Sequence, residues 1–299
     1  MEVWLNGSWT PRDAAKVSAF DAGFQHGVGL FETMHARNGR VFRLHAHLER
    51  MAASAKSLRL SESLRVAPLG EAVEATVARN GLRDARVRLT ITGGDLNLLQ
   101  RGADRSRHAP TLLIVAQPPT KYPDALFANG VRVTIADARS NPLDPSAGHK
   151  TLWYWPRLAA LQQAGANGAT EALWFSVTNH LASGCVSNVF LVKDGVVRTP
   201  VARGEEVEGG LPAPVLPGVT RAAIFELCTE AGARIDRCML TYDDLRGADE
   251  VFLTNSSWGV MPVVQVERVT IGSGAVGPVA TSLRAALEER VERETSTPA

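Results

Sequence analysis

Strand-forming and helix-forming stretches alternate only irregularly along this chain of 299 residues. Apolar residues at helical spacing predict helices over 43–58 and 66–79. Period-two apolar patterns predict strands over 85–92 and 111–117. A doubly wound parallel sheet requires a regular strand–helix alternation. The observed order is therefore a poor fit to that fold, and it favours a mixed α+β or α/β architecture.

Turn signals divide the remaining strands. Asn6-Gly7 and Asn38-Gly39 are dipeptides typical of tight β-hairpins, so we expect one hairpin at the N-terminus and a second over 31–42. The second half of the chain contains six further predicted strands, at 131–138, 171–177, 187–193, 196–199, 249–255 and 261–266. It also contains three predicted helices, at 156–164 with Gly165 as its cap, at 220–231, and from Pro278 onward.

A proline-rich stretch at 117–123 separates the two halves. Such a stretch is typical of a domain boundary. We expect a smaller N-terminal α/β domain over 1–118, an interdomain loop over 119–130 and a larger C-terminal domain over 131–299 that carries Lys150.

Composition excludes several classes of partner. A net charge of +1 gives no strong field for nucleic acid or an anionic membrane, and no apolar run is long enough to span a bilayer. The three cysteines are odd in number and lack metal-ligand spacing. The N-terminus lacks the pattern of a secretory signal. We expect a cytoplasmic protein with no metal site and no nucleic-acid or membrane partner.

Lys150 is one of only five lysines among 32 basic residues. It follows a turn-rich loop and precedes an apolar run of Leu152, Trp153, Tyr154 and Trp155. Desolvation among these side chains would lower the pKa of the amine and expose its lone pair, as a Schiff-base lysine requires. On position alone, a solvated lysine at a loop end is the more common case.

Three features are suited to binding a phosphate. The sequence PGVTR at 217–221 places a glycine and a hydroxyl at a helix start, where N–H groups attract anions. The sequence TNSSWG at 254–259 places two hydroxyls in a turn after a strand. Arg50 lies on a helix with an apolar face. Taken singly, each feature is more often an ordinary helix cap, an ordinary turn or a surface arginine.

Six segments taken together are more specific. They lie at 23–34, 42–51, 149–161, 183–195, 216–224 and 252–263. In this order they resemble the class IV aminotransferases, the fold-type IV enzymes that use pyridoxal 5'-phosphate (PLP). That family includes branched-chain and D-amino-acid aminotransferases and aminodeoxychorismate lyase. The resemblance implies a two-domain fold of the D-amino-acid aminotransferase type, a PLP cofactor, small amino-acid and keto-acid substrates, and a homodimer.

The resemblance also implies roles for individual residues. Lys150 matches the lysine that forms the Schiff base and moves the proton. Phe31 matches an aromatic residue that borders the substrate pocket, although core packing explains it equally well. The implied cofactor contacts are Arg50, Val219, Thr220, Ser256 and Ser257 for the phosphate, Leu216 for the ring face and Tyr154 for the phenolic oxygen.

Four positions depart from the family pattern. Ser183 stands where the family has a glutamate that pairs with the pyridine nitrogen, and a hydroxyl makes a weaker bond there than a carboxylate. Trp153 replaces an asparagine, Val28 an acidic residue, and Gly93 the arginine of the substrate-carboxylate loop. The candidates to replace that arginine are Arg101, Arg107 and His108.

Three functions follow from the resemblance. The first is an aminotransferase that moves an amino group between an amino acid and a 2-keto acid through a Lys150 Schiff base. The second is an elimination of the aminodeoxychorismate lyase type, which gives pyruvate. The third is a non-catalytic relative, which Ser183 supports and Lys150 opposes.

Overall fold

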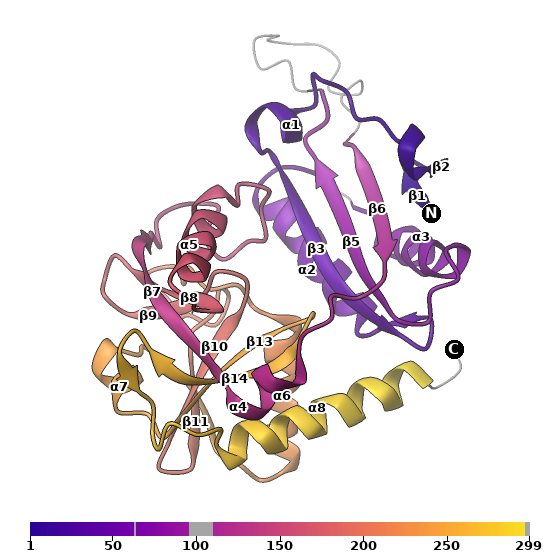
Figure 1. Ribbon diagram of the computed structural model, residues 1–299. Coiled ribbons are helices and arrows are strands. Elements are labelled where there is room, and N and C mark those ends of the chain that lie inside the picture. The colour runs from indigo at the N-terminus through magenta and orange to yellow at the C-terminus, as the bar shows by residue number, and fades with distance from the viewer. Residues whose placement is uncertain (63, 96–109, 297–299) are drawn as a thin grey trace. The chain divides into compact units, whose positions relative to one another are not determined.

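The computed structural model describes residues 1–62, 64–95 and 110–296 (Figure 1). Contacts within the chain define two units. Unit 1 contains Met1–Thr120, His149–Trp153 and Val291–Ala299, and unit 2 contains Lys121–Gly148 and Tyr154–Arg290. The short segment with Lys150 therefore groups with the first 120 residues. The domain limits drawn from the sequence stay a prediction.

Unit 1 is built on an antiparallel six-stranded sheet, counted over the described residues, in the order β2-β1-β6-β5-β3-β4. Its strands are β1 (Glu2–Leu5), β2 (Ser8–Pro11), β3 (Gly29–Arg37), β4 (Arg40–Val41), β5 (Ala85–Thr92) and β6 (Leu112–Gln117). Both predicted hairpins are confirmed. Asn6, Gly7, Asn38 and Gly39 all have positive φ, as the two central residues of a type I′ turn require.

Two helices pack on this sheet, α2 (Leu44–Ser57) and α3 (Val66–Arg79) (Figure 1). Their apolar faces bury Leu48, Met51 and Val73 against Leu89 and Ile91 of β5. Both helices were predicted from the helical spacing of their apolar residues, and the structure confirms them. That spacing places the apolar side chains on one face of each helix. A short 3-10 helix, η1 (Arg12–Ala14), and the helix α1 (Ala22–His26) complete the unit.

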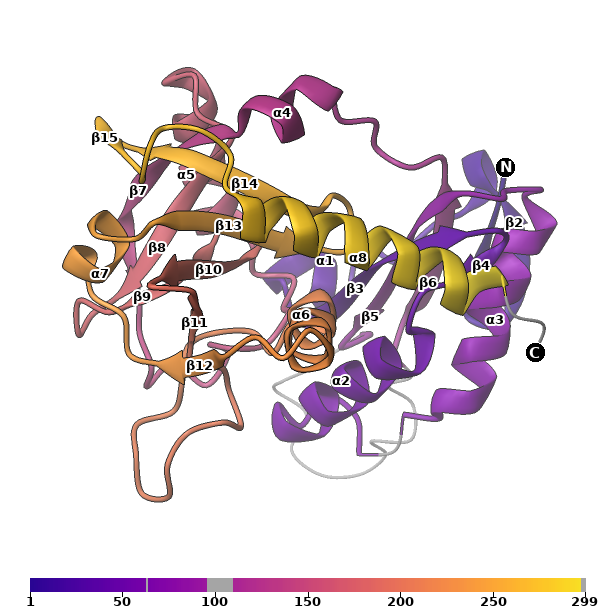
Figure 2. The same ribbon diagram turned by 90° about the horizontal axis from the view of Figure 1, so that it is seen from below.

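Unit 2 contains a mixed sheet with nine described strands, in the order β12-β11-β10-β13-β14-β7-β8-β9, with β15 beside β14 (Figure 2). The strands are β7 (Val131–Ser140), β8 (Glu171–Ser176), β9 (Leu181–Gly184), β10 (Asn188–Lys193), β11 (Val196–Pro200), β12 (Ile235–Cys238), β13 (Glu250–Asn255), β14 (Gly259–Val266) and β15 (Val269–Thr270). Only the β11–β12, β14–β7 and β7–β8 pairs are parallel among the described strands. This mixture confirms that the fold is not doubly wound.

The helices in the second half of the chain are α4 (Asp124–Asn129), α5 (Trp155–Ala166), α6 (Val219–Glu230), α7 (Tyr242–Arg246) and α8 (Pro278–Ser296). The last turns of α8 belong to unit 1. The prediction of Gly165 as the cap of α5 is wrong, because Gly165 lies inside the helix. Gly168 takes the left-handed conformation instead, and the N–H of Ala169 donates to the carbonyl of Ala164 at 2.8 Å.

Two further features bear on the expectations from sequence. The predicted interdomain loop, 119–130, contains the helix α4. Among the described residues, no helix combines the length and the apolarity needed to cross a membrane.

Candidate functional site

Lys150 is held against β3 by backbone pairing within unit 1. The N–H of Phe31 donates to the carbonyl of Lys150 at 2.9 Å, and the N–H of Leu152 donates to the carbonyl of Gly29 at 2.9 Å. Leu30 and Thr151 form the antiparallel bridge between them. A Cβ on Gly29 would overlap with the carbonyl oxygen of Ile91 and meet the side chain of Leu152. Glycine at this position therefore permits the close approach that places Lys150.

The side chain of Lys150 lies against an aromatic ring. Its Nζ is 4.5 Å from the ring centroid of Phe31, and Phe31 is only 5% exposed. The guanidinium of Arg88 lies 3.8 Å from the same centroid. The sequence predicts an amine among Leu152, Trp153, Tyr154 and Trp155, but Trp153 and Trp155 are 60% and 64% exposed. Both indoles lie largely in solvent, and Phe31 is an apolar side chain that the amine contacts.

Arg50 is paired with the carboxylate of Glu32, which is not among the predicted site residues. Its Nε donates to Oε1 of Glu32 at 2.9 Å and its Nη2 donates to Oε2 at 2.5 Å. His47 Nδ1 lies 2.8 Å from the same Oε2. Glu32 and His47 are 1% and 2% exposed. A two-point pair of this kind sets the plane of the guanidinium.

The protonation states of this cluster follow from its burial and charge. Burial opposes ionisation of Glu32, but the charge of Arg50 and the bonds from His47 and Arg50 outweigh it and lower its pKa to about 2. Burial lowers the pKa of His47, and the charges of Arg50 and Lys150 lower it further. The hydrogen bond and the charge of Glu32 raise this pKa but do not outweigh the other effects. His47 is therefore neutral, with its Nδ1–H donating to Glu32.

The signal for this cluster was present in the sequence. Glu32 follows Phe31 in a strand whose neighbours are apolar, and His47 and Arg50 stand three residues apart on α2. Residues three apart share one face of a helix. The spacing of these two side chains therefore indicated a shared partner.

In unit 2, the turn at 183–187 is bound from α5. The hydroxyl of Tyr154 donates to the carbonyl of Cys185 at 2.8 Å. Arg157 Nη1 donates to the carbonyl of Gly184 at 2.8 Å and to Oγ of Ser183 at 3.2 Å. Ser183 is 5% exposed. Tyr154 and Ser183, both predicted site residues, are thus brought to one turn, and Arg157 joins them although the sequence did not single it out.

Glu171 on β8 stabilises the same turn by accepting hydrogen bonds from it. Its carboxylate accepts from the N–H groups of Ala172, Cys185 and Val186 at 3.1, 2.9 and 3.2 Å and from Oγ of Ser187 at 3.0 Å. Its side chain is fully buried, and this burial raises its pKa. Four donors on one carboxylate give the turn a single conformation. A lone glutamate in an apolar strand was the only sequence signal for it.

The start of α6 offers N–H groups for an anion. Gly218 is its N-cap and provides no side-chain cap, while Val219 and Thr220 are buried. A Cβ on Gly218 would overlap with the side-chain amide of Asn188, whose Nδ2 donates to the carbonyl of Leu216 at 2.9 Å. The loop before α6 is thereby held against β10, in the form that anion-binding helix starts share.

The turn after β13 is stabilised by Asn255. Its Oδ1 accepts from the N–H groups of Ser257 and Trp258 at 2.8 and 3.0 Å. This side chain therefore organises the turn that carries Ser256 and Ser257. The buried Oγ1 of Thr254, directly before the turn, has no hydrogen-bond partner among the described residues.

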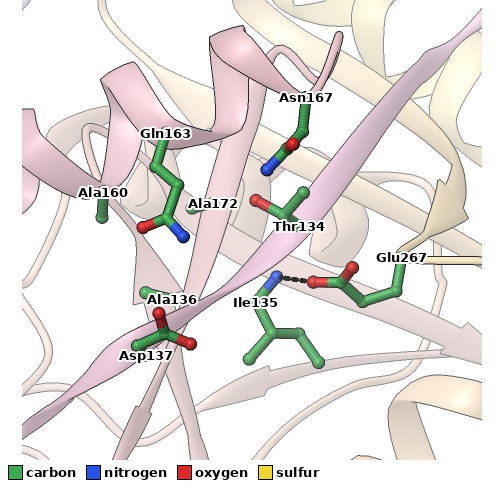
Figure 3. A pocket seen from close by; sticks show the side chains of 9 residues that line it. All are labelled: Thr134, Ile135, Ala136, Asp137, Ala160, Gln163, Asn167, Ala172 and Glu267. Carbon is green, nitrogen blue, oxygen red and sulfur yellow. Dashed lines mark hydrogen bonds between the residues drawn. The ribbon is translucent and has the colours of Figure 1, made fainter.

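Two further regions of the chain lie apart from these groups or outside the described residues. A cavity of about 200 Å³ lies in unit 2 against β7 and α5, where Asp137, Gln163 and Glu267 line it (Figure 3). No residue predicted for the cofactor or substrate lines this cavity. The predicted substrate residues Arg101, Arg107 and His108 lie outside the described residues.

A sequence model of the family described as amino-transferase class IV matches residues 29–266. The chain belongs to the class IV aminotransferases. Members of this family are PLP-dependent aminotransferases or lyases, so the chain is an enzyme of that group.

Relatives cover the chain nearly end to end. The D-alanine aminotransferase of Bacillus licheniformis is 30% identical over an alignment of 299 positions that covers 99% of this chain and 99% of that protein. A T.th. branched-chain amino acid aminotransferase, solved with N-(5'-phosphopyridoxyl)-L-glutamate, is 28% identical with a TM-score of 0.84, over 97% of this chain and 93% of that one. The 4-amino-4-deoxychorismate lyase from Pseudomonas aeruginosa is 28% identical with a TM-score of 0.81. The match covers 96% of this chain and 98% of that one. This class IV aminotransferase therefore has the mixed α/β fold of type IV.

Each unit of this class IV aminotransferase, taken by itself, contains groups of the kind that PLP requires. Unit 1 supplies an amine beside a buried aromatic ring, together with an oriented arginine. Unit 2 supplies a helix start whose cap position excludes any Cβ. Among the described residues, no group of three or more His, Cys, Asp or Glu side chains is placed to hold a metal ion.

Proposed function

We propose that this chain is a PLP-dependent aminotransferase that moves an amino group between an amino acid and a 2-keto acid. The observation that carries the proposal is the placement of Lys150, which backbone pairing holds on β3 with its amine against Phe31. The family match and the pyridoxyl adduct of the branched-chain relative support the cofactor. When bound, PLP supplies an aldehyde for the amine and an electron-withdrawing ring.

We propose separate roles for the chain's residues in proton transfer, cofactor binding and substrate binding. Lys150 Nζ would hold the cofactor through its aldehyde carbon; once the substrate's amine has displaced it, the free Nζ would take the proton from the substrate's α-carbon and deliver it to that former aldehyde carbon. Phe31 borders the substrate. The phosphate is bound by Arg50, which Glu32 orients, and by Val219, Thr220, Ser256 and Ser257. Tyr154 and Leu216 contact the ring, and Ser183 faces its nitrogen. Arg101, Arg107 and His108 stay candidates for the substrate carboxylate.

The second candidate is elimination of the lyase type. It is supported by the full-length match to the Pseudomonas aeruginosa lyase and by the hydroxyl of Ser183 in place of a carboxylate. The non-catalytic hypothesis is not retained, since the chain belongs to a family of enzymes.

One experiment separates the two activities. The purified protein is incubated with 2-keto acid plus either a branched-chain amino acid or D-alanine, and in parallel with aminodeoxychorismate. We expect a new amino acid in the first assays and neither pyruvate nor p-aminobenzoate in the second. Pyruvate and p-aminobenzoate without amino transfer would replace the proposal by the lyase. Lys150→Ala is the control, and it is expected to remove either activity.

We also propose a cytoplasmic homodimer. Three free cysteines support a reducing compartment. The large exposed side chains of Phe24, Trp153 and Trp155 support burial against a second copy. Light scattering on a sizing column is expected to give twice the 32.1 kDa chain mass, and a mass of one chain would contradict the dimer. Cell fractionation tests the location, and recovery outside the cytoplasmic fraction would contradict it.

A further inference from the structure

Arg157 is held in unit 2 by an aromatic ring and by three acceptors. It belongs to the first turn of α5, and its guanidinium carbon lies 4.9 Å from the ring centroid of Trp174. Its Nη1 donates to Oγ of Ser183 at 3.2 Å and to the carbonyl of Gly184 at 2.8 Å, with Cys185 at 3.4 Å. Trp174 is 5% exposed. The cation therefore has a defined position beside Ser183.

Among the described residues, no carboxylate contacts the guanidinium of Arg157. Glu171 is the nearby acid on β8, but its two oxygens are occupied by four other donors. Within the described ranges, Arg157 forms no ion pair. The charge beside Ser183 is therefore positive, whereas the family's glutamate at this position is negative.

The Ser183 hydroxyl is consequently a donor toward any further partner. Its oxygen already accepts from Arg157, so its own O–H can be given to an acceptor. A hydroxyl that accepts from a cation is polarised and donates more strongly. A neighbouring positive charge also disfavours protonation of a basic nitrogen.

Resting on the proposed function, we propose that Arg157 and Ser183 together bind the pyridine nitrogen of PLP in its unprotonated form. Ser183 donates to the nitrogen lone pair, and Arg157 is a positioning residue that acts through Ser183. The ring then withdraws electrons from the substrate's α-carbon less strongly than in relatives with glutamate. The pair thus sets the electronic character of the cofactor in this enzyme.

The test reads the nitrogen directly. The full chain is loaded with PLP carrying ¹⁵N in the ring, and the ¹⁵N resonance is followed from about pH 6 to pH 9. We expect the resonance of an unprotonated pyridine throughout. Ser183→Glu is expected to move it to the pyridinium position and to raise the amino-transfer rate. Arg157→Gln is expected to bring a protonation step into the pH range, and Arg157→Lys to remove that step again.

The controls separate the possible failures. Arg234→Gln, which removes an exposed arginine next to β12, is expected to match the wild type. Cofactor loading is measured independently, by absorbance and by borohydride reduction onto Lys150. If the wild type takes no cofactor, the proposed function fails and this inference fails with it. If it loads but shows a pyridinium resonance, only the inference is overturned. If Arg157→Gln does not fold, the wild-type resonance and Arg157→Lys still decide.

Discussion

Lys150 and Phe31 are joined twice, once through the backbone and once through their side chains. The N–H of Phe31 donates to the Lys150 carbonyl at 2.9 Å, and Lys150 Nζ lies 4.5 Å from the Phe31 ring centroid. The backbone bond fixes the position of the residue, and the ring limits where its amine can point. A lysine used as a nucleophile benefits from both constraints.

Gly29→Ala is expected to displace this lysine. Its Cβ would overlap with the carbonyl oxygen of Ile91 and press on Leu152, so the segment at 150–152 must move off β3. Overpacking of this kind costs about 1–3 kcal/mol. We expect loss of stability in urea and at least tenfold slower Schiff-base formation, followed by absorbance. Gly165→Ala is the matched control, since its Cβ meets nothing within 4 Å. Unchanged Schiff-base kinetics in Gly29→Ala would contradict the account.

Glu32→Gln is expected to reduce stability at neutral pH and to change how stability depends on pH. The pKa of Glu32 is lowered from its ordinary value of 4.5 to about 2. A depressed carboxyl pKa contributes stability above the unfolded pKa that is lost as pH falls toward the folded one. At about 1.4 kcal/mol per pKa unit, the contribution is about 3 kcal/mol, present above about pH 5 and lost between pH 4.5 and 2.

Urea unfolding from pH 7 down to about pH 3 measures this contribution. We expect Glu32→Gln to be less stable than the wild type by about 3 kcal/mol at pH 7, because Arg50 loses its buried partner. The difference is expected to shrink as pH falls. Glu49→Gln, on the same helix but exposed, should follow the wild type within about 0.5 kcal/mol. A constant difference at all pH values would show that Glu32 does not titrate as described.

Gly218→Ala is expected to weaken cofactor binding. The added Cβ would overlap with Asn188, which holds the loop before α6 through the carbonyl of Leu216. The N–H groups at the start of α6 would then shift away from the phosphate. We expect the PLP dissociation constant, measured by fluorescence quenching, to rise at least tenfold. Pyridoxal without a phosphate is the matched ligand control, and its weaker binding should change little. Equal effects on both ligands would mean that α6 does not bind the phosphate.

Local sequence patterns predicted many of the helices and strands. The elements that were not predicted, or were given wrong limits, share one cause. Helix α3 has the predicted limits because its apolar residues recur at helical spacing. Strand β9, LASG, was missed because four small or apolar residues carry no period, and its pairing with β8 forms it. The end of α5 was misplaced because Gly165 is a helical glycine and Gly168 makes the turn. Tertiary contacts decide such short elements.

The site shows the same division. Lys150, Arg50 and Ser183 are predicted site residues because their segments resemble those of the class IV aminotransferases. Glu32 was missed because its partner Arg50 stands 18 residues away on another element, although the spacing of His47 and Arg50 on α2 indicates a shared partner. Arg157 and Ser183 stand 26 residues apart, on a helix and a strand. Their hydrogen bond forms only when α5 packs against β8, which pairs with the strand β9 that contains Ser183. No local sequence pattern predicts this bond.

The proposed function depends on the covalent attachment of PLP to Lys150. The most direct measurement is borohydride reduction of the protein after addition of PLP, followed by peptide mass analysis of wild type, Lys150→Ala and the exposed-lysine control Lys121→Ala. We predict one reduced adduct, on Lys150, in the wild type and in Lys121→Ala, and none in Lys150→Ala. An adduct that persists in Lys150→Ala, or a wild type that stays colourless with PLP, would contradict it.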